Sequence, residues 1–136
     1  MRNDFPYLAV SVDHSHASAI ALPIVDRDTM LASAEHDFEL LGQLIELFLA
    51  ESPGLLAEIR AGVRDGDAES IERAAHTLRT ALTSFGAGRV CQAAHQLELR
   101  ARELRLDDSA QLLAALESDL AQACMALSEY LRTASR

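Results

Sequence analysis

The sequence predicts an all-α fold: an antiparallel up-and-down four-helix bundle with a short additional N-terminal helix. The 136 residues are 49% hydrophobic but only 4% aromatic, with no Trp, and this composition favours helices packed on helices. Apolar residues recur with the helical period in every long segment, and no segment alternates with the period of two that a strand requires. The linking segments span only about three to five residues, so consecutive helices are expected to be antiparallel neighbours.

The chain is expected to form one domain behind a lead-in segment. Residues 1–27 show no sustained periodicity and are predicted to be a tail or a loosely packed lead-in, whereas residues 28–136 form the bundle domain. Asp28 is a candidate N-cap for a short helix over residues 29–35. The residues that this helix would bring onto the core are Met30 and Leu31.

The first long helix is expected to begin after Asp37, a second candidate N-cap. Pro53 has no backbone N–H and disfavours a helical Ser52, so a kink or a break is expected there. The helical pattern then resumes and stops at the turn Asp65-Gly66-Asp67. The apolar residues with helical spacing are Phe38, Leu41, Leu44, Ile45, Phe48, Leu49, Leu55, Leu56, Ile59 and Val63.

Asp67 is expected to cap the next helix, over residues 68–85. The segment Gly86-Ala87-Gly88 should end it, because glycine tolerates left-handed backbone angles. The segment Asp107-Asp108-Ser109 is expected to cap the last helix. The residues expected to face inward are Val90, Ala94, Leu97, Ala101 and Leu104 in the segment after Gly88, and Leu112, Leu113, Leu116, Leu120, Leu127 and Leu131 in the last helix.

His76 is predicted to point into solvent from the middle of its helix. At 100° per residue it lies about 140° from Ile71 around the helix axis. The apolar stripe lies within about 60° of Ile71 and consists of Ile71, Ala74, Ala75, Leu78, Leu82 and Phe85. A histidine that fills space in a core would lie on this stripe. The position of His76 instead suits a nucleophile that meets a macromolecular partner, with Arg79 one turn away.

The charge is unevenly distributed along the chain. The formal net charge is −9, but residues 60–105 carry a balance of +2, against −8 for residues 1–59 and −3 for residues 106–136. All basic residues are Arg, which suits the recognition of oxyanions. So acidic a chain is not expected to bind nucleic acid, whereas a partner with a locally anionic site would be drawn to the middle segment.

Several other classes of protein are disfavoured. No run of 18 apolar residues is present, so no transmembrane span is expected, and the first residues lack a clear signal peptide. Cys91 and Cys124 are too few for a disulfide framework, which favours a reduced, cytoplasmic setting. No Gly-rich nucleotide-binding loop is visible. Outward-facing carboxylate and imidazole pairs on the helices do not make a metal site, and the tail segment 13–16 is expected to be polar and solvated.

Several motifs resemble those of the histidine-containing phosphotransfer (HPt) domain family, over about residues 28–132. The residues that carry the resemblance are His76-Thr77-Leu78-Arg79, Phe85-Gly86-Ala87 and Leu97-Glu98, with Phe48 and the Gly66-Asp67 turn upstream. The resemblance implies a four-helix bundle. It also implies that His76 takes a phosphoryl group from an aspartyl phosphate on one receiver domain and hands it to another receiver.

The resemblance also implies roles and partners. His76 is the expected phosphoryl acceptor, through Nε2, because neutral imidazole offers a lone pair at neutral pH. Arg79 occupies the family's Lys position and is expected to stabilise the phosphoryl group. The partners are response-regulator receiver domains, with a hybrid histidine kinase as a further one. The protein itself is expected to be a monomeric phosphocarrier that binds no membrane, has no ATP site and needs no cofactor, with Mg²⁺ supplied by the receiver.

Four further residues of this helix are candidates for supporting or docking roles: Glu72, Arg73, Thr80 and Thr83. Glu72 either orients the ring through Nδ1 or pairs with Arg73 or Arg79. Thr80 stands where the family has Gly, and Ala81 where it has Ser. The Thr80 side chain is expected to lean toward His76. Three roles remain open for it: it crowds the approaching receiver, its hydroxyl bonds the phosphoryl oxygens, or its hydroxyl bonds the His76 carbonyl within the helix.

These departures leave two alternative functions open. The first is an HPt-like module that is not phosphorylated, but binds a receiver and blocks it. The second is a structural helical adaptor in which His76 has no chemical role.

Overall fold

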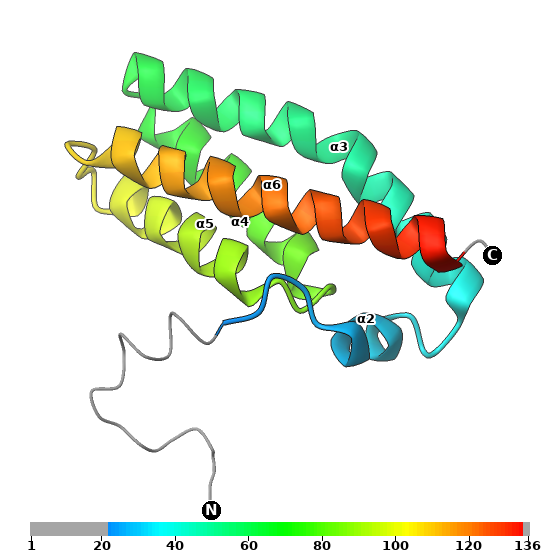
Figure 1. Ribbon diagram of the computed structural model, residues 1–136. Helices are drawn as coiled ribbons and strands as arrows, with labels where there is room; N and C mark the ends of the chain where they lie inside the picture. The colour runs from blue at the N-terminus through cyan, green and yellow to red at the C-terminus, as the bar shows by residue number, and fades with distance from the viewer. Residues whose placement is uncertain (1–21, 135–136) are drawn as a thin grey trace, which may run out of the picture.

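The computed structural model describes residues 22–134, and this part of the chain is helical with no strand. The helices are α2 (Arg27–Ser33), α3 (Phe38–Asp65), α4 (Ala68–Thr83), α5 (Gly88–Arg102) and α6 (Ser109–Ala134) (Figure 1). The predicted all-α class is therefore confirmed. The tail segment 13–16 lies outside the described residues.

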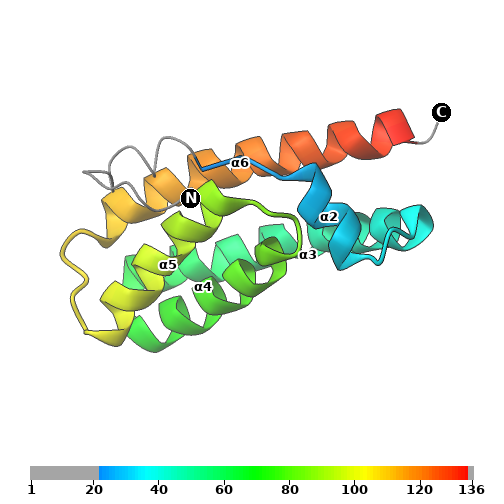
Figure 2. The ribbon, with the colours of Figure 1, turned by 90° about the horizontal axis from the view of Figure 1, so that it is seen from below.

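Helices α3 to α6 form the bundle. Helix α4 packs on α3 and on α5, and α6 packs on α5 and on α3, so each helix has two neighbours. Successive helices run in opposite directions, as short connections require (Figures 1 and 2). Helix α2 lies across the end of the bundle where α3 begins and α6 ends. There the Arg27 guanidinium carbon is 5.3 Å from the centroid of the Tyr130 ring.

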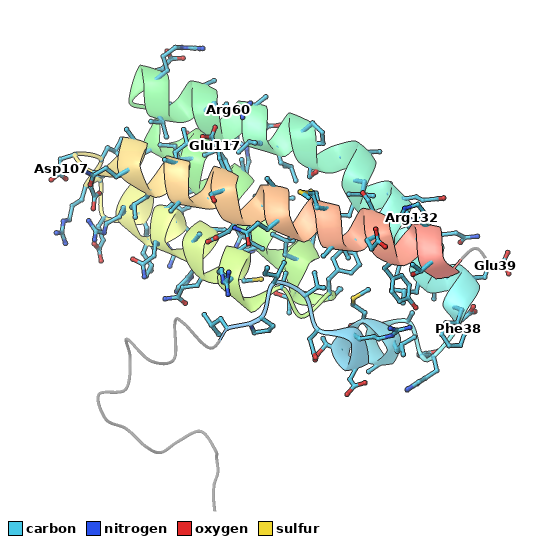
Figure 3. The ribbon with its side chains drawn as sticks, viewed as in Figure 1. Phe38, Glu39, Arg60, Asp107, Glu117 and Arg132 are labelled. Atoms are coloured by element: carbon cyan, nitrogen blue, oxygen red, sulfur yellow. The ribbon has the colours of Figure 1, made fainter. Side chains whose placement is uncertain are left out.

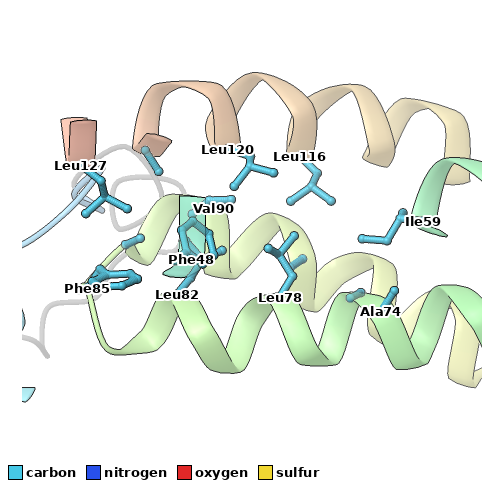
Figure 4. Packing of buried hydrophobic residues seen from close by; sticks show 14 of the residues in the cluster. Phe48, Ile59, Ala74, Leu78, Leu82, Phe85, Val90, Leu116, Leu120 and Leu127 are labelled. Carbon is cyan, nitrogen blue, oxygen red and sulfur yellow. The ribbon is translucent and has the colours of Figure 1, made fainter. Parts of the chain in front are cut away.

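The core is built from the apolar stripes that the sequence shows (Figure 4). Phe48 of α3 meets Phe85 edge-on, with ring centroids 5.5 Å apart and an angle of 64° between the ring planes. The side chains that are fully buried include Leu41, Ile45, Ile59, Ile71, Leu78, Leu82, Leu97, Leu116 and Leu127. The helix packing of this core fixes which face of α4 is left for solvent.

The short N-terminal helix exists but begins two residues earlier than predicted. Asp26, not Asp28, is its N-cap: Oδ2 of Asp26 accepts a hydrogen bond from the Thr29 amide at 3.2 Å. Asp28 lies in the first turn, where a negative charge is favourable beside the helix N-terminus. The lead-in before α2 is bonded to the bundle as well, because Pro23 and Asp26 pair with the backbone of Arg89 and Phe85 at 3.0 and 2.9 Å.

Helix α3 begins after Asp37 as predicted, with the Leu40 amide donating to Oδ1 of Asp37 at 3.1 Å. The helix continues through Pro53, so the alternative of a break is wrong. Pro53 is exposed and the packed turns on both sides hold the helix together across the missing hydrogen bond. Phe38 is also not a core residue: it opens the helix at the end of the bundle and is 65% exposed (Figure 3).

Helix α4 ends at Thr83 rather than at residue 85, although Phe85 is still buried. Gly86 then takes a left-handed conformation with φ of 62°. A Cβ on Gly86 would lie 2.5 Å from Cβ of Asp26, so the turn needs glycine for both conformation and space. The glycine turn was predicted, but its contact with the segment before α2 was not.

One residue expected in the core after α5 is exposed. Leu104 is 78% exposed because α5 ends at Arg102, and Leu104 then adopts φ of 59° and leaves the helical period. Helix α6 begins at Ser109, at the predicted acidic turn. Across the bundle surface Arg60 of α3 pairs with Glu117 of α6, with Nε and Oε2 2.6 Å apart (Figure 3).

Candidate functional site

His76 lies at the middle of α4, on the face that points away from the core. Oδ1 of Asp67 caps this helix by accepting from the Ser70 amide at 3.2 Å. The stripe residues Ile71, Ala75 and Leu78 are fully buried. The His76 side chain is 57% exposed. The predicted solvent exposure of this ring is therefore confirmed.

Glu98 of α5 holds the inner nitrogen of this ring. Oε2 of Glu98 is 2.9 Å from Nδ1 of His76, and the Glu98 side chain is only 1% exposed. A carboxylate only accepts hydrogen bonds, so Nδ1 carries the proton and donates it. In a neutral ring this proton position leaves the lone pair on Nε2, on the side facing away from the carboxylate.

Two arginines share the buried carboxylate with His76. Arg79 donates from Nε to Oε1 of Glu98 at 2.8 Å and from Nη2 to Oε2 at 3.3 Å. Arg102, one turn after Glu98 on α5, donates from Nη2 to Oε2 at 2.9 Å. The Nη2 atom of Arg79 is also 3.2 Å from Nδ1 of His76. Because both atoms are donors, this contact places positive charge beside the ring without bonding it.

These donors keep Glu98 ionised. Burial by itself raises the pKa of the Glu98 carboxyl, but the hydrogen bonds from Arg79 and His76 and their charges outweigh it and lower the pKa to about 2. The same ion pair raises the pKa of Arg79 above its ordinary value. At neutral pH the site thus contains a fixed negative charge directly behind the imidazole.

Glu72 has a different partner from those predicted. Its Oε2 accepts from Nε of Arg102 at 2.9 Å, so it bonds neither the His76 ring nor Arg73 or Arg79. Arg73 is exposed, and its Nη2 lies 3.5 Å from Oγ of Ser70. The role foreseen for Glu72 at Nδ1 belongs to Glu98, because α5 packs against α4 and brings a buried carboxylate closer.

The threonines of α4 fall into two groups. Thr77 and Thr83 each donate from Oγ1 to the carbonyl four residues earlier, at 3.0 and 2.9 Å. Thr80 is exposed, and its hydroxyl bonds none of the residues that the structure describes. The interpretation in which Thr80 bonds the His76 carbonyl is therefore wrong. Its side chain is exposed one turn after His76 on α4.

An apolar groove runs beside the histidine between α3 and α4. The groove floor and walls are Leu44, Leu47, Phe48, Leu55, Ala81 and Phe85, with Glu51, Thr77 and Ser84 as polar members. Leu47 is 54% exposed. Thr77 lines both this groove and the polar depression that contains His76 and Arg102. A partner that covers the histidine therefore also meets an apolar surface.

The apolar face of α3 has a second consequence. Among residues 22–134, α3 is a helix long and apolar enough to cross a membrane by length and composition. Most of its apolar residues instead pack in the bundle core or line the groove, whereas Phe38 and Leu40 are exposed. A core helix of a soluble bundle passes the same test, so this composition is weak evidence for a membrane.

The described residues place no group of three or more His, Cys, Asp or Glu side chains together to hold a metal ion. The site contains instead an exposed imidazole, a buried carboxylate and two guanidinium groups. This set suits nucleophilic attack by Nε2 on an electrophile that a partner carries, with positive charge nearby for an anionic group.

Glu98 and Arg102 are the site residues that reasoning from the sequence missed. Glu98 lies in the Leu97-Glu98 motif, but the sequence alone assigns its side chain no contact with His76. The packed structure also brings Oε1 of Glu98 within 3.9 Å of Nδ1 of His95. The available signal was an acidic residue beside a buried stripe with an arginine one turn later. Its contact with His76 depends on how α4 and α5 pack, and helical periodicity does not give that.

Comparison with known proteins identifies the family and the fold. The chain matches the model of the Hpt domain family over residues 43–132. No match was found among curated proteins. The structure is similar to the crystal structure of histidine-containing phosphotransfer protein B from Pseudomonas aeruginosa PAO1. The two share 20% sequence identity, with a TM-score of 0.77, over 83% of this chain and 98% of that one. The four-helix fold and the matched residues together show that this chain belongs to the Hpt domain family of phosphorelay modules.

Proposed function

We propose that this protein is a phosphorelay intermediate whose His76 accepts a phosphoryl group from a receiver-domain aspartyl phosphate and passes it to another receiver. The observation that carries the proposal is the pairing of His76 with Glu98. The ring is 57% exposed, and a carboxylate that is 1% exposed lies 2.9 Å from Nδ1. This arrangement supports Nε2 as the attacking atom.

The transfer requires no proton from solvent. The Nε2 lone pair forms a bond to phosphorus while the bond between phosphorus and the aspartate oxygen breaks, and its electron pair stays on the aspartate carboxylate. The phosphorylated ring becomes positively charged and keeps its proton on Nδ1, where the Glu98 carboxylate stabilises that charge. The return step to a second receiver is the same exchange in reverse.

Arg79 supports the reaction through its charge. Its Nη2 lies 3.2 Å from Nδ1, close enough to the ring to favour the phosphoryl group electrostatically. Transfer of this kind depends on positioning and charge stabilisation rather than on covalent chemistry by the carrier. The carrier supplies no ATP site, and the Mg²⁺ used in the transfer comes from the receiver.

The groove between α3 and α4 supports docking of a receiver domain. It places an apolar surface beside the helix that carries the histidine, and its polar members include Thr77, the residue after His76. This is the composition of a specific interface. The partners are response-regulator receivers and, through its receiver, a hybrid histidine kinase. The protein works as a cytoplasmic monomer that binds neither nucleic acid nor membrane.

Thr80 favours a second candidate function. Its branched side chain stands one turn from His76 with no bond that draws it aside, and it occupies the space that a receiver must enter. A module that docks on a receiver, is not phosphorylated and thereby blocks the receiver fits this observation.

Incubation with a phosphorylated receiver tests these functions. The wild-type protein is expected to gain an acid-labile, base-stable phosphate, and His76→Gln none, while both bind the receiver. Binding of the wild type without label would support the blocking module instead. If the wild type neither binds nor is labelled by any of a panel of receivers, the remaining function is that of a structural adaptor.

A further inference from the structure

Arg102 of α5 divides its hydrogen bonds between two carboxylates of different burial. Nη2 donates to Oε2 of the buried Glu98 and Nε to Oε2 of Glu72, both at 2.9 Å. The Arg102 side chain is 53% exposed and that of Glu72 38%. Together with His76, both line the polar depression beside the ring. The Arg102 guanidinium thus has one anchored side and one side that solvent reaches.

The site is balanced in charge before phosphorylation and unbalanced after it. Arg79 and Arg102 offset Glu72 and Glu98 while the imidazole is neutral. A phosphoryl group brings a charge of about −1.5 to −2 and three acceptor oxygens. The positive charge that the ring gains offsets only part of this. A further donor with a positive charge therefore stabilises the phosphorylated state.

Arg79 is poorly placed to supply that donor. Two of its nitrogens are bonded to Glu98, and its side chain is 29% exposed. Turning it toward a phosphoryl group would remove two bonds from a buried carboxylate, which is unfavourable. The bond between Arg102 and Glu72 is different, because exposed ion pairs contribute little to stability and Glu72 is readily hydrated once released.

Arg102 is also close enough. Its Nη2 and the Nδ1 of His76 are each 2.9 Å from the same oxygen, Oε2 of Glu98. The guanidinium can therefore keep its Nη2 bond to Glu98 and turn its other N–H donors from Glu72 toward the outer face of the ring. A guanidinium has five N–H donors in a fixed plane, which allows one carboxylate and one phosphoryl group to be bonded together.

We infer that Arg102 is a second phosphoryl-binding cation of this site, which exchanges Glu72 for the phosphoryl group when His76 is phosphorylated. The inference rests on the proposed function, because it needs a phosphoryl group on Nε2. It assigns Glu72 a role as well: Glu72 holds Arg102 in the unphosphorylated state and competes with the phosphoryl group for it.

The test labels the whole protein with phosphoramidate, a small phosphodonor that needs no docking surface. The pKa of the phosphoryl group on His76 is then measured by ³¹P NMR. A cation in contact lowers the pKa of an acidic group, so Arg102→Gln is expected to raise the phosphoryl pKa by about 0.5 unit or more. Glu72→Gln removes the competitor and is expected to lower it. The matched controls, Arg105→Gln and Glu69→Gln, are expected to leave it close to the wild-type value.

The double variant decides whether Glu72 acts through Arg102. If it does, Glu72→Gln has no effect in the Arg102→Gln background. The inference is overturned if Arg102→Gln behaves like Arg105→Gln, or if the effect of Glu72→Gln is unchanged in the double variant. Should Arg102→Gln fail to fold, equal phosphoryl pKa values in Glu72→Gln and Glu69→Gln overturn it as well. Absence of label on the wild type, by contrast, contradicts the proposed function itself.

Discussion

Glu98 and His76 come from different helices, and the buried carboxylate of the first lies 2.9 Å from Nδ1 of the second. The pair fixes the orientation of the ring and the atom that remains free to react. The packing of α4 on α5 therefore determines the chemistry of an exposed side chain.

Replacing the Glu98 carboxylate by an amide is expected to slow phosphotransfer. Glu98→Gln can still accept the Nδ1 proton, but it removes the negative charge that stabilises the phosphorylated ring and satisfies Arg79. We expect transfer from a phosphorylated receiver to fall roughly 10- to 100-fold, or about 1.4–3 kcal/mol in activation free energy. Glu103→Gln, at the exposed end of α5, is the matched control. Equal rates for the two variants would contradict the role of Glu98.

The same carboxylate predicts how stability depends on pH. Its pKa is about 2 in the folded protein, against an ordinary value of 4.5, so the unfolded chain binds the proton more readily. The stabilisation is complete above about pH 4.5 and is lost as the pH falls toward 2, and it amounts to at most a few kcal/mol. Urea unfolding should show that the difference in unfolding free energy between the wild type and Glu98→Gln becomes smaller as the pH falls through this range. A gap that stays constant from pH 6 to about pH 2 would contradict the assignment.

Thr80 should limit how fast a receiver reaches His76. Thr80→Gly removes the side chain in the path of the receiver, and we expect receiver-dependent transfer to become several-fold faster. Labelling by phosphoramidate should change little, because the small donor does not need that space. Glycine within a helix destabilises by about 1 kcal/mol, so Thr80→Ala serves as the variant without this cost. Slower labelling with both donors would show instead that the hydroxyl binds the phosphoryl group.

The apolar groove between α3 and α4 should contribute to the affinity for the receiver. Leu47→Asn places an amide on its exposed apolar surface, and we expect the affinity for the receiver to fall about tenfold while phosphoramidate labelling is retained. Met125→Asn alters another exposed apolar residue, on α6 and away from the groove, and is the control. Isothermal titration calorimetry measures both. Unchanged affinity in Leu47→Asn, or an equal loss in Met125→Asn, would place the interface elsewhere.

The sequence predicts the bundle well because helical periodicity and capping residues are local signals. Asp37 and Asp67 cap the expected helices, and the stripe around Ile71 faces the core. The predictions of buried residues fail at the ends of the bundle, where a local apolar pattern continues beyond the packed helices. Phe38 and Leu104 have the right spacing but no neighbouring helix to cover them.

The candidate site, too, could be predicted from the sequence only in part. The exposure of His76 follows from its angle on one helix, so the sequence predicts it. The partner of Nδ1 depends on the rotation of α5 about its own axis relative to α4. A choice between Glu72 and Glu98 thus required the packed structure, and so did the pairing of Glu72 with Arg102.

The most direct measurement is to locate the phosphoryl group on the ring after transfer from a phosphorylated receiver. Long-range ¹H–¹⁵N NMR of the labelled protein distinguishes the two ring nitrogens. We expect one phosphoryl group, on Nε2 of His76, with the proton still on Nδ1 beside Glu98. A phosphoryl group on Nδ1, or on any residue other than His76, would contradict it.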